Sequence, residues 1–347
     1  MTHHENHKTH SFSASVDRRA FIRASAAAAG AAVLAPHSPL SAAEPSGAPR
    51  VRPNILYALS TGSWGRVTAA GRPLPLLEIL DETAAAGFNG VRLTGFPDIL
   101  ERNGLTVEQY GDHLARRGLK FSTVSFGGEY HNPDKHAEIR ERARQALAAH
   151  RRFGATALVF FPPGPVAGAD EAATLAASFA FMNELGKMAI DEFGIRIGLH
   201  NHTDSMIENQ AQVDRFLEGT DPRYVFCAWD TAHLHLGGCD VQSTFKKSID
   251  RIVYTDFKDA TRTPVETDYV SPIGERFAGD SHQGRFFNSM LELGRGQIDF
   301  VALMRMLAQR KYRGWINHDL DTIRVSTAES WRVSMNYIRE NLDPLYE

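Results

Sequence analysis

Histidine and aspartate side chains follow four apolar runs in the C-terminal half of the chain. They are His200 and His202, Asp230 and His233, Asp256, and His318, Asp319 and Asp321. Carboxylates that converge without partners in a buried site are costly, and a bound divalent cation is the usual remedy. Nitrogen and oxygen ligands without thiolate suit Mn, Zn, Co, Fe or Mg. The pattern predicts a site for one divalent metal ion, and a metal-free polar network is the alternative.

Eight short β-rich runs have to position these side chains. They are Ile55–Leu59, Gly90–Leu93, Lys120–Val124, Ala157–Phe161, Arg196–Asn201, Tyr224–Asp230, Arg251–Lys258 and Gly314–Asp321. Amphipathic helical stretches separate them, and strands that alternate with helices imply parallel strands joined by right-handed crossovers. No GxGxxG or Walker motif is present in the sequence, so a nucleotide-binding sheet lacks its signature. The sequence therefore predicts an α/β fold, a single (β/α)8 TIM barrel with its reactive groups at the C-terminal strand ends.

The segment Ala260–Gln297, between the seventh strand and its helix, is unusually long and rich in Gly, Pro, Asp and Arg. A long loop at this end of a barrel is usually functional, and a mobile surface insertion is the alternative. Its Arg262, His282 and Arg285 are candidate contacts to substrate hydroxyls or anions.

Further substrate-binding candidates lie near the ends of the earlier strands. Glu129 and His131 follow the third strand and are candidates for binding sugar hydroxyls, as are Tyr57 and Arg92. Trp64 or Trp229 could stack on a sugar face, although aromatic residues at such positions more often belong to the core or the wall.

The first 43 residues have the pattern of an export signal. Arg18 and Arg19 precede an alanine-rich stretch from Ala24 to Ala35, and small residues at Ser41–Ala43 offer a cleavage site. This arrangement resembles the twin-arginine export motif, and a chance pair of arginines before a flexible tail is the alternative. The apolar stretch is shorter than the roughly 20 residues of a membrane span, which argues against a stable membrane anchor.

We therefore expect a signal peptide at 1–43, a linker at 44–52 and a barrel at 53–347. The expected location is the periplasm or the cell exterior, with the twin-arginine export machinery as a partner. The complete chain of 347 residues has a formal net charge of −3. The first 43 residues hold four basic and two acidic residues, so the charge without them is −5, which argues against a nucleic-acid binder. Two cysteines exclude a disulfide framework.

Several motifs of the chain resemble the xylose isomerase-like TIM-barrel family. Asp230 to His233 resembles its Asp-x-x-His motif, Phe257 to Asp259 its His-x-Lys-Asp motif, Leu293 to Phe300 its Leu-Gly-x-Gly-x-Ile-Asp-Phe run and Tyr312 to Ile316 its Tyr-x-Gly-Trp-Ile run. The resemblance implies one divalent metal held by Glu, Asp, His and Glu from strands five to eight. In this chain the corresponding residues are His200, Asp230, Asp256 and Asp319, so one imidazole and one acid have exchanged strands.

The resemblance implies proton abstraction beside a carbonyl, with the metal stabilising an enediolate. An imidazole bound to a metal has committed its lone pair and cannot also be the base, so epimerisation by two metal-bound glutamates does not carry over. His202, His233 and Lys258 are the candidate acid and base groups. Each has a structural alternative. His202 would only form a hydrogen bond to a metal ligand, His233 would orient Asp230, and Lys258 would form an ion pair with Asp259.

The first functional hypothesis is an exported, metal-dependent sugar isomerase or epimerase. Its alternatives are a lyase or dehydratase that acts on a keto-sugar such as a 3-keto-glycoside, and a sugar-binding protein without catalysis. An endonuclease of apurinic sites would need more metal ligands and a basic groove. Export favours a small-molecule substrate that is a free or glycosidically linked sugar. The resemblance also implies a homo-oligomer.

Overall fold

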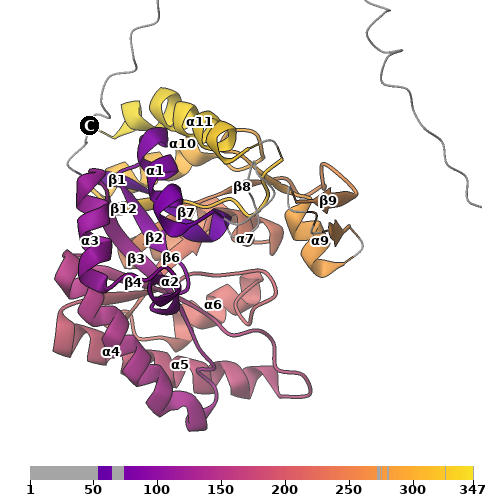
Figure 1. Ribbon diagram of the computed structural model, residues 1–347. Helices are drawn as coiled ribbons and strands as arrows, with labels where there is room; N and C mark the ends of the chain where they lie inside the picture. Colours follow the sequence, from indigo (N-terminus) through magenta and orange to yellow (C-terminus); the bar gives the residue numbers. More distant parts are fainter. Residues whose placement is uncertain are drawn as a thin grey trace, which may run out of the picture. The chain divides into compact units, whose positions relative to one another are not determined.

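The computed structural model describes residues 54–64, 74–271, 274, 276–279, 281–324 and 326–346, without the side chains of Trp64, His282 and Gln283. In this part of the chain, eight parallel strands close into a barrel in the order β1-β12-β7-β6-β5-β4-β3-β2 (Figure 1). The predicted TIM barrel is thereby confirmed. The predicted signal peptide at 1–43 and linker at 44–52 lie outside the described residues.

The eight barrel strands of the described residues lie close to the β-rich runs of the sequence. They are β1 (Ile55–Ser60), β2 (Gly90–Leu93), β3 (Lys120–Gly127), β4 (Ala157–Phe161), β5 (Arg196–Leu199), β6 (Val225–Asp230), β7 (Ile252–Phe257) and β12 (Gly314–His318).

Helices connect the strands and cover the outside of the barrel. The α-helices are α1 (Leu76–Ala86), α2 (Asp98–Arg102), α3 (Val107–Arg116), α4 (His136–Phe153), α5 (Glu171–Met188), α6 (Gln210–Gly219), α7 (Thr231–Leu236), α8 (Val241–Ser248), α9 (His282–Phe287), α10 (Phe300–Gln309) and α11 (Thr327–Tyr337). Short turns of other helix types are η1 (Thr61–Trp64), η2 (Pro133–Lys135), η3 (Ala189–Phe193), η4 (Ile249–Arg251), η5 (Ile338–Leu342) and η6 (Asp343–Leu345).

Three strands end earlier than the sequence predicts. β5 ends at Leu199, β7 at Phe257 and β12 at His318, so the polar residues that follow lie outside the barrel strands. After β5, the side-chain amide of Asn201 accepts a hydrogen bond from the backbone N–H of Asp230 (2.9 Å) and donates to the Asp230 carbonyl oxygen (3.3 Å). Because a side chain replaces the ladder bonds at this point, the backbone after Leu199 is free to turn into the site.

The core fills the space between the strands and the surrounding helices. Trp229 on β6 is fully buried there, and its indole N–H donates to the hydroxyl of Ser248 at 2.8 Å. Trp229 is thus a core residue, the placement that the sequence favoured over stacking on a sugar. Tyr57 is also directed away from the strand ends, and its hydroxyl donates to Asp343 at 3.1 Å. Within the described residues, no helix combines the length and the apolar character that a membrane crossing requires.

The predicted long loop after β7 contains regular structure. β8 (Asp259–Ala260) pairs with β11 (Met290–Leu291), and β9 (Asp268–Val270) pairs with β10 (Arg276–Ala278), both antiparallel. With α9 they form a lobe, drawn in orange in Figure 1, which we call the 260–297 lobe. The rings of Phe277 and Phe287 lie 3.9 Å apart between centroids, and Tyr269 stacks beside both. The lobe therefore has a small aromatic core of its own.

The glycine-rich motif that follows the lobe holds the carboxylate of Asp259. This carboxylate accepts hydrogen bonds from the backbone N–H groups of Gly294 (3.0 Å), Gly296 (2.8 Å) and Ile298 (3.3 Å). A Cβ at position 296 would lie 2.1 Å from Asp259 Oδ1, so only glycine fits there. The alternative in which Asp259 pairs with Lys258 is wrong. The Leu-Gly-x-Gly-x-Ile motif has a structural role, in which its backbone binds an anion.

The stability of the fold should depend on pH through His150 of α4. Its Nδ1 donates to the Ala146 carbonyl (2.7 Å), its Nε2 faces the Thr123 hydroxyl (3.0 Å), and burial lowers the pKa of His150 to about 4 from an ordinary 6.5. Below pH 6.5 the unfolded chain therefore takes up a proton that the folded chain does not, and stability falls as the pH falls. From about pH 7.5 to about pH 5, this residue should contribute about 2 kcal/mol of the loss.

Urea unfolding of the native chain and of His150→Gln at these two pH values checks the prediction. The variant should lose about 2 kcal/mol less stability on acidification than the native chain. Equal losses in the two proteins would show that His150 does not carry this dependence.

Candidate active site

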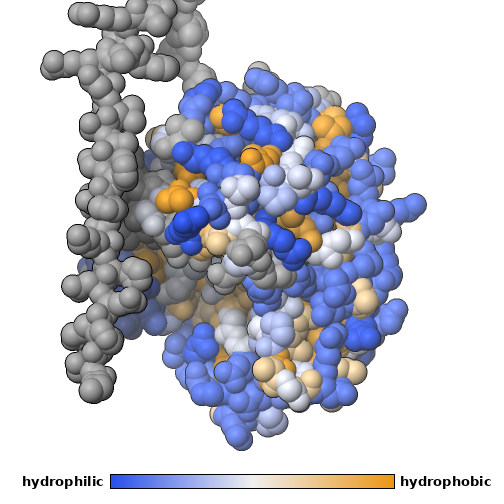
Figure 2. Space-filling view, turned by 90° about the vertical axis from the view of Figure 1, so that its right-hand side faces the viewer, coloured by the Kyte–Doolittle hydropathy of each residue, from blue (hydrophilic) through white to orange (hydrophobic). Residues whose placement is uncertain are grey.

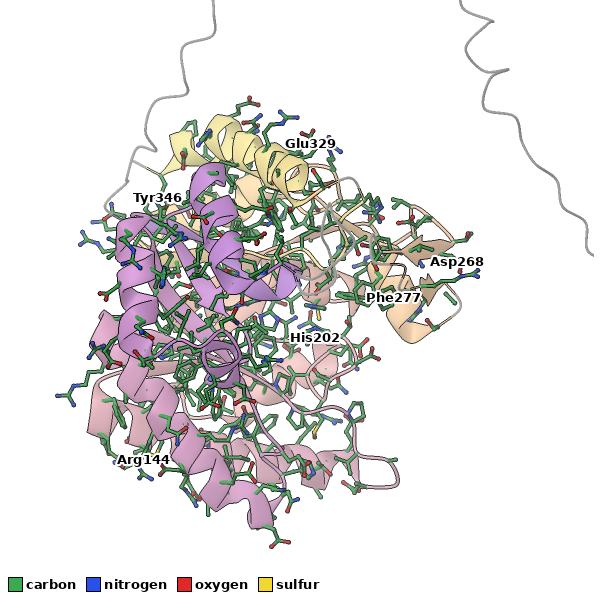
Figure 3. The ribbon with its side chains drawn as sticks, in the orientation of Figure 1. Arg144, His202, Asp268, Phe277, Glu329 and Tyr346 are labelled. Atoms are coloured by element: carbon green, nitrogen blue, oxygen red, sulfur yellow. The ribbon has the colours of Figure 1, made fainter. Side chains whose placement is uncertain are left out.

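Polar side chains from β2, β5, β6, β7, β12 and the loops that follow them gather at the C-terminal end of the barrel. Seven of the described ones are each at most 7% exposed: Arg92, His200, Asp230, His233, Asp256, Lys258 and Asp319. His202, labelled in Figure 3, lies between the barrel and the lobe that carries Asp268 and Phe277. The structure thus brings together the polar strand ends that the sequence singled out.

Asp230 is both the last residue of β6 and the N-cap of α7. Its Oδ1 accepts a hydrogen bond from the backbone N–H of His233 at 3.0 Å. This capping bond explains the spacing of the Asp-x-x-His motif, because the third residue of the helix supplies the N–H. The other oxygen, Oδ2, is directed into the site. Burial raises the pKa of Asp230 to about 7.

His200 lies between two carboxylates. Its Nδ1 is 2.6 Å from Asp256 Oδ2, and its Nε2 is 3.8 Å from Asp230 Oδ2. A proton on Nδ1, the nitrogen next to Asp256, leaves the lone pair on Nε2, the nitrogen nearer Asp230, and the Nδ1 contact is an ion-pair approach without hydrogen-bond geometry. A carboxylate that fixes the tautomer in this way is a common support for a metal-binding histidine. Burial lowers the pKa of His200 to about 4, so the ring is neutral near pH 7.

His233 completes a buried group with His200 and Asp230. One ligand atom from each of the three lies within 4.8 Å of the other two. Its Nδ1 lies 3.1 Å from the Thr203 hydroxyl and accepts a hydrogen bond from the Thr203 backbone N–H (3.3 Å), and its Nε2 lies 3.3 Å from the Lys258 ammonium and 3.9 Å from Asp230 Oδ2. Burial and the nearby His202 lower the pKa of His233 well below its ordinary value. Two neutral imidazoles and one carboxylate are a ligand set that suits Zn, Fe, Mn or Co.

Lys258 provides a buried positive charge beside this group. Its ammonium lies 3.0 Å from Asp230, 3.2 Å from Asp319 and 2.7 Å from Asp321. Burial alone would lower the pKa of Lys258, but the three carboxylates raise it well above its ordinary value. The residue is therefore charged near neutral pH. The structure argues against Lys258 as a base and favours a role in holding the carboxylates and stabilising negative charge.

Arg92 at the end of β2 bridges two of the predicted metal ligands. One guanidinium nitrogen pairs with Asp256, and the other lies 2.7 Å from Asp319 Oδ2. Asp319 also accepts a hydrogen bond from the Ser63 hydroxyl at 2.8 Å. Burial alone would raise the pKa of Asp319, but Lys258 and Arg92 hold it well below its ordinary value. The structure does not bring Asp256 and Asp319 into the group of His200, Asp230 and His233, and their role as ligands stays a prediction.

The charges of the site fit one divalent cation. Four carboxylates, on Asp230, Asp256, Asp319 and Asp321, meet two buried cations, Arg92 and Lys258. With Asp230 ionised, as it would be when it binds a metal, two negative charges remain among these described groups, which balances the charge of one divalent ion. The oxygen Asp230 Oδ2 has an ion-pair contact with Lys258 but no well-directed hydrogen bond, so it can accept a further partner. The residues present therefore fit a metal held by His200, Asp230 and His233.

His202 has the geometry of a general base. Its Nδ1 donates a hydrogen bond to the carbonyl oxygen of Thr203, which leaves Nε2 with a lone pair. The His202 ring lies 3.8 Å from the ring of His233 between centroids, and the residue lines the cavities described below. Burial and the charge of Lys258 lower the pKa of His202. The imidazole is therefore neutral near pH 7 and able to accept a proton.

Two cavities open at this end of the barrel. The larger measures about 600 Å³ and is lined by residues that include Ser60, Arg92, Thr94, Ser125 and His200. The smaller measures about 390 Å³ and is lined by residues that include Pro162, Thr203, Ser205, Phe286 and Phe287. Phe161, His202 and Asp321 line both cavities, so the two meet beside the candidate base.

Several predicted substrate contacts lie elsewhere. Glu129 is exposed and accepts a hydrogen bond from Asn132, and neither it nor His131 lines these two cavities. Arg262 lines a separate surface pocket beside His235. Arg285 is exposed on α9 and is absent from the lining of both cavities, and the side chain of His282 is not described. As substrate contacts these residues remain predictions.

His318 and Asp321, the two neighbours of Asp319 that could replace it as a ligand, lie on different sides of the chain. His318 points into the helix layer, where its ring packs edge-on against Trp331 and its Nδ1 donates to the Phe257 carbonyl at 2.9 Å. Asp321 instead joins Asp319 at Lys258. The strand alternation therefore places the two aspartates on the site side and His318 on the helix side.

Sequence reasoning missed three contributors to the site. Ser63 bonds Asp319, Thr203 orients His233, and Phe286 of the 260–297 lobe stacks on the His233 ring at 4.7 Å between centroids. Hydroxyl and phenyl side chains are common in every segment, so these residues carry no signal of their own. The position of Thr203 directly after the His-Asn-His run is the one clue that the sequence offered.

Comparisons with known proteins agree with the fold. A family model described as xylose isomerase-like TIM barrel matches residues 80–341. The chain is 26% identical over 310 residues to an inosose dehydratase of Bacillus velezensis, which covers 84% of this chain and 98% of the relative. It is 27% identical over 308 residues to an inosose dehydratase of Halalkalibacterium halodurans, which covers 83% and 95%.

Among solved structures, the fold is similar to a crystal structure of IOLI protein with a bound zinc atom. The TM-score is 0.66 at 13% sequence identity, and the match covers 84% of this chain and 99% of that one. At this identity the likeness concerns the fold.

Proposed function

The chain belongs to the xylose isomerase-like TIM barrel family, whose members include sugar isomerases, epimerases and dehydratases, and we propose that it is a metal-dependent lyase of the dehydratase type. Its substrate is a keto-sugar or a related cyclic polyol ketone. The observation that carries the proposal is that, among the described side chains of the site, one group has the geometry to accept a proton from a substrate. His202 keeps a free lone pair, whereas Lys258 and Arg92 hold the surrounding carboxylates.

The reaction begins at the carbon beside the carbonyl group. His202 Nε2 takes the proton of that carbon, and the electron pair of the C–H bond forms an enolate. His200, Asp230 and His233 would hold a divalent ion, which when bound would supply Lewis-acid stabilisation of the negative charge. Lys258, 3.0 Å from Asp230, adds a fixed positive charge next to it.

The enolate then collapses and expels the oxygen substituent of the next carbon. The C–O bond breaks, a C=C bond forms, and the imidazolium of His202 gives its proton to the leaving oxygen. The products are an unsaturated ketone and water or an alcohol. One group serves as base and then as acid, so a second base on the opposite face is not needed. Epimerisation, in contrast, needs a proton donor on that face.

The relatives named inosose dehydratase support a lyase over the isomerase or epimerase that was the first expectation. Aldose–ketose isomerisation is the second candidate, because one base and one metal also suffice for it. Proton NMR in deuterium oxide separates the two. A lyase converts a keto-sugar to an unsaturated ketone with a new vinyl signal, whereas an isomerase exchanges a carbon-bound proton without elimination.

Removal of the metal by a chelator distinguishes the lyase and isomerase hypotheses from a sugar-binding protein without catalysis. Treatment with EDTA should abolish turnover, and added Zn²⁺ or Mn²⁺ should restore it. A chain that binds sugars, contains no metal and exchanges no carbon-bound proton would contradict the proposal.

We also propose that the chain is exported by the twin-arginine route, on the basis of Arg18, Arg19 and the alanine-rich stretch that follows them. Fractionation of cells that express the full chain tests this location. Retention of the whole protein in the cytoplasm would contradict it.

A further inference from the structure

The two cavities that meet at His202 differ in the chemistry of their walls. The larger contains the metal-site residue His200 and a row of hydroxyl groups beside Phe126, and the smaller is bounded by Phe161, Phe286 and Phe287 on one hand and by Thr203, Asp204 and Ser205 on the other. Ligand pockets of proteins measure about 300–1,000 Å³, so each cavity alone is large enough for one unit of a small molecule. Figure 2, which views the side that carries the 260–297 lobe, shows a mostly hydrophilic face in its coloured residues.

The hydroxyl row extends along three neighbouring strands. Ser60 on β1 lies 3.5 Å from Thr94, which follows β2, and Thr94 lies 3.3 Å from Ser125 on β3. The backbone N–H of Gly62 donates to Ser60 at 3.3 Å. Two hydrogen bonds within the row use two of its three hydroxyl hydrogens, so one O–H remains to donate to a ligand. Such a row suits a ligand unit with several hydroxyl groups.

The charges around both cavities disfavour an anionic ligand. Among the described residues that line them, Arg92 is the one lysine or arginine, and its guanidinium is already shared between Asp256 and Asp319. Asp204, Asp319 and Asp321 contribute carboxylates to the walls. A phosphate group would meet these carboxylates, and the described lining residues offer it no free cation to pair with.

The smaller cavity combines three phenyl rings with the polar side chains of Thr203, Asp204 and Ser205. The rings of Phe161 and Phe286 lie 6.4 Å and 5.9 Å from the His202 ring between centroids. Pro162 and Phe287 extend the apolar wall beyond them. A planar or ring-shaped substituent can pack against such walls.

We infer that the site takes a neutral two-unit substrate: an uncharged sugar ring in the larger cavity, carrying a glycosidic substituent with an apolar face in the smaller one. This inference rests on the proposed function for the sugar ring, and it adds the second subsite and the exclusion of sugar phosphates. The junction at His202 places the linkage between the two units beside the candidate base.

Binding of unreactive glycosides to the full-length chain tests the inference. The probes for isothermal titration calorimetry are methyl and phenyl glycosides of glucose, galactose and mannose, and the 6-phosphates of the three sugars. For the best-bound sugar, the phenyl glycoside should bind about tenfold more tightly than the methyl glycoside, because the cavity buries an additional ring. The sugar phosphates should not bind measurably.

A variant that fills the smaller cavity provides the discriminating measurement. A Cβ at Gly164 would lie 3.6 Å from its nearest neighbour, the Asp204 carbonyl, so Gly164→Phe introduces a ring there without a clash at its base. It should remove the tenfold advantage of the phenyl glycoside and leave the methyl glycoside unaffected. Val166→Phe, at an exposed position of the same loop outside the cavity, is the matched control and should keep the advantage.

Three results would overturn the inference: equal binding of methyl and phenyl glycosides, an advantage that survives in Gly164→Phe, or binding of no neutral glycoside of the panel. Proton exchange on keto-sugars, measured separately, reports on the proposed function. Exchange without a phenyl advantage would refute the second subsite alone, and a phenyl advantage without exchange would refute the lyase alone.

Discussion

Replacement of His233 by alanine should lower the affinity of the chain for Zn²⁺ or Mn²⁺ on the order of a thousandfold, whereas Asp319→Asn should lower it far less. Loss of an outer-shell partner typically costs 10–100-fold, and loss of a direct ligand should exceed that range. The expectation follows from geometry, because Nε2 of His233 belongs to the buried group with His200 and Asp230. Asp319 is instead held by Arg92, Lys258 and Ser63.

Elemental analysis of the purified variants, followed by competition with a chelator, measures these affinities. Asp256→Asn should lose about 10–100-fold, because Asp256 orients His200 through its Nδ1. His235→Ala is the control, since His235 bonds Gln297 outside the group. If Asp319→Asn strips the metal while His233→Ala retains it, the ligand set implied by the family resemblance holds and the one proposed from the geometry fails.

Arg92→Met should destabilise the chain by about 3–5 kcal/mol, the usual cost of breaking a buried ion pair from one side. The guanidinium is 2% exposed and bridges Asp256 and Asp319, so its removal leaves two buried carboxylates with fewer partners. Urea unfolding of the metal-free protein, followed by circular dichroism, measures the change. The metal is removed because a bound ion would partly replace the missing charge.

A rescue distinguishes charge from packing as the cause. Adding Asp256→Asn to Arg92→Met removes one of the unpaired charges and should recover part of the lost stability. Arg144→Met is the surface control: Arg144, labelled in Figure 3, pairs with Glu192 through two nitrogens at 3.0 Å but is 43% exposed. Its loss should cost less than about 1 kcal/mol. Equal effects of the two arginine variants would refute the buried bridge as a source of stability.

The barrel was predictable because each strand has a recognisable sequence pattern of its own. Short β-rich runs alternate with amphipathic helices, and crossover rules leave few ways to close eight such units. The polar strand ends could be placed together on the same grounds, since parallel strands direct their C-terminal ends to one side of the barrel. His200, Asp230 and His233 meet as that reasoning requires.

Which of the aspartates pair with buried cations could not be predicted from the sequence. Arg92 is separated from Asp256 by 164 residues and from Asp319 by 227, and the closure of the barrel alone brings them into contact. A sequence shows which strands end in acids but not which acid an arginine from a distant strand will neutralise. Arg92 was therefore expected to bind sugar hydroxyls, and Lys258, which three carboxylates keep charged, was expected to serve as an acid or base.

The residues that line the cavities could not be identified from the sequence either. Ser60, Thr94 and Ser125 form a row only because β1, β2 and β3 are neighbours in register, and serine and threonine are too common to attract notice. Phe286 reaches the site from a segment whose sequence predicts a loop without a fixed path. Side chains that contribute through their shape are harder to identify from a sequence than side chains that contribute through their charge.

The 260–297 lobe begins and ends at nearly the same place, because β8 pairs with β11 and the carboxylate of Asp259 holds the backbone at Gly294 and Gly296. A segment closed at its base can change in length at small entropic cost, about 0.6 kcal/mol for each doubling. Insertions, deletions and exchanges within it need not disturb the strands below. Evolution, or an engineer who grafts a lobe from a relative, can therefore change the wall that Phe286 contributes while the buried group of His200, Asp230 and His233 stays in place.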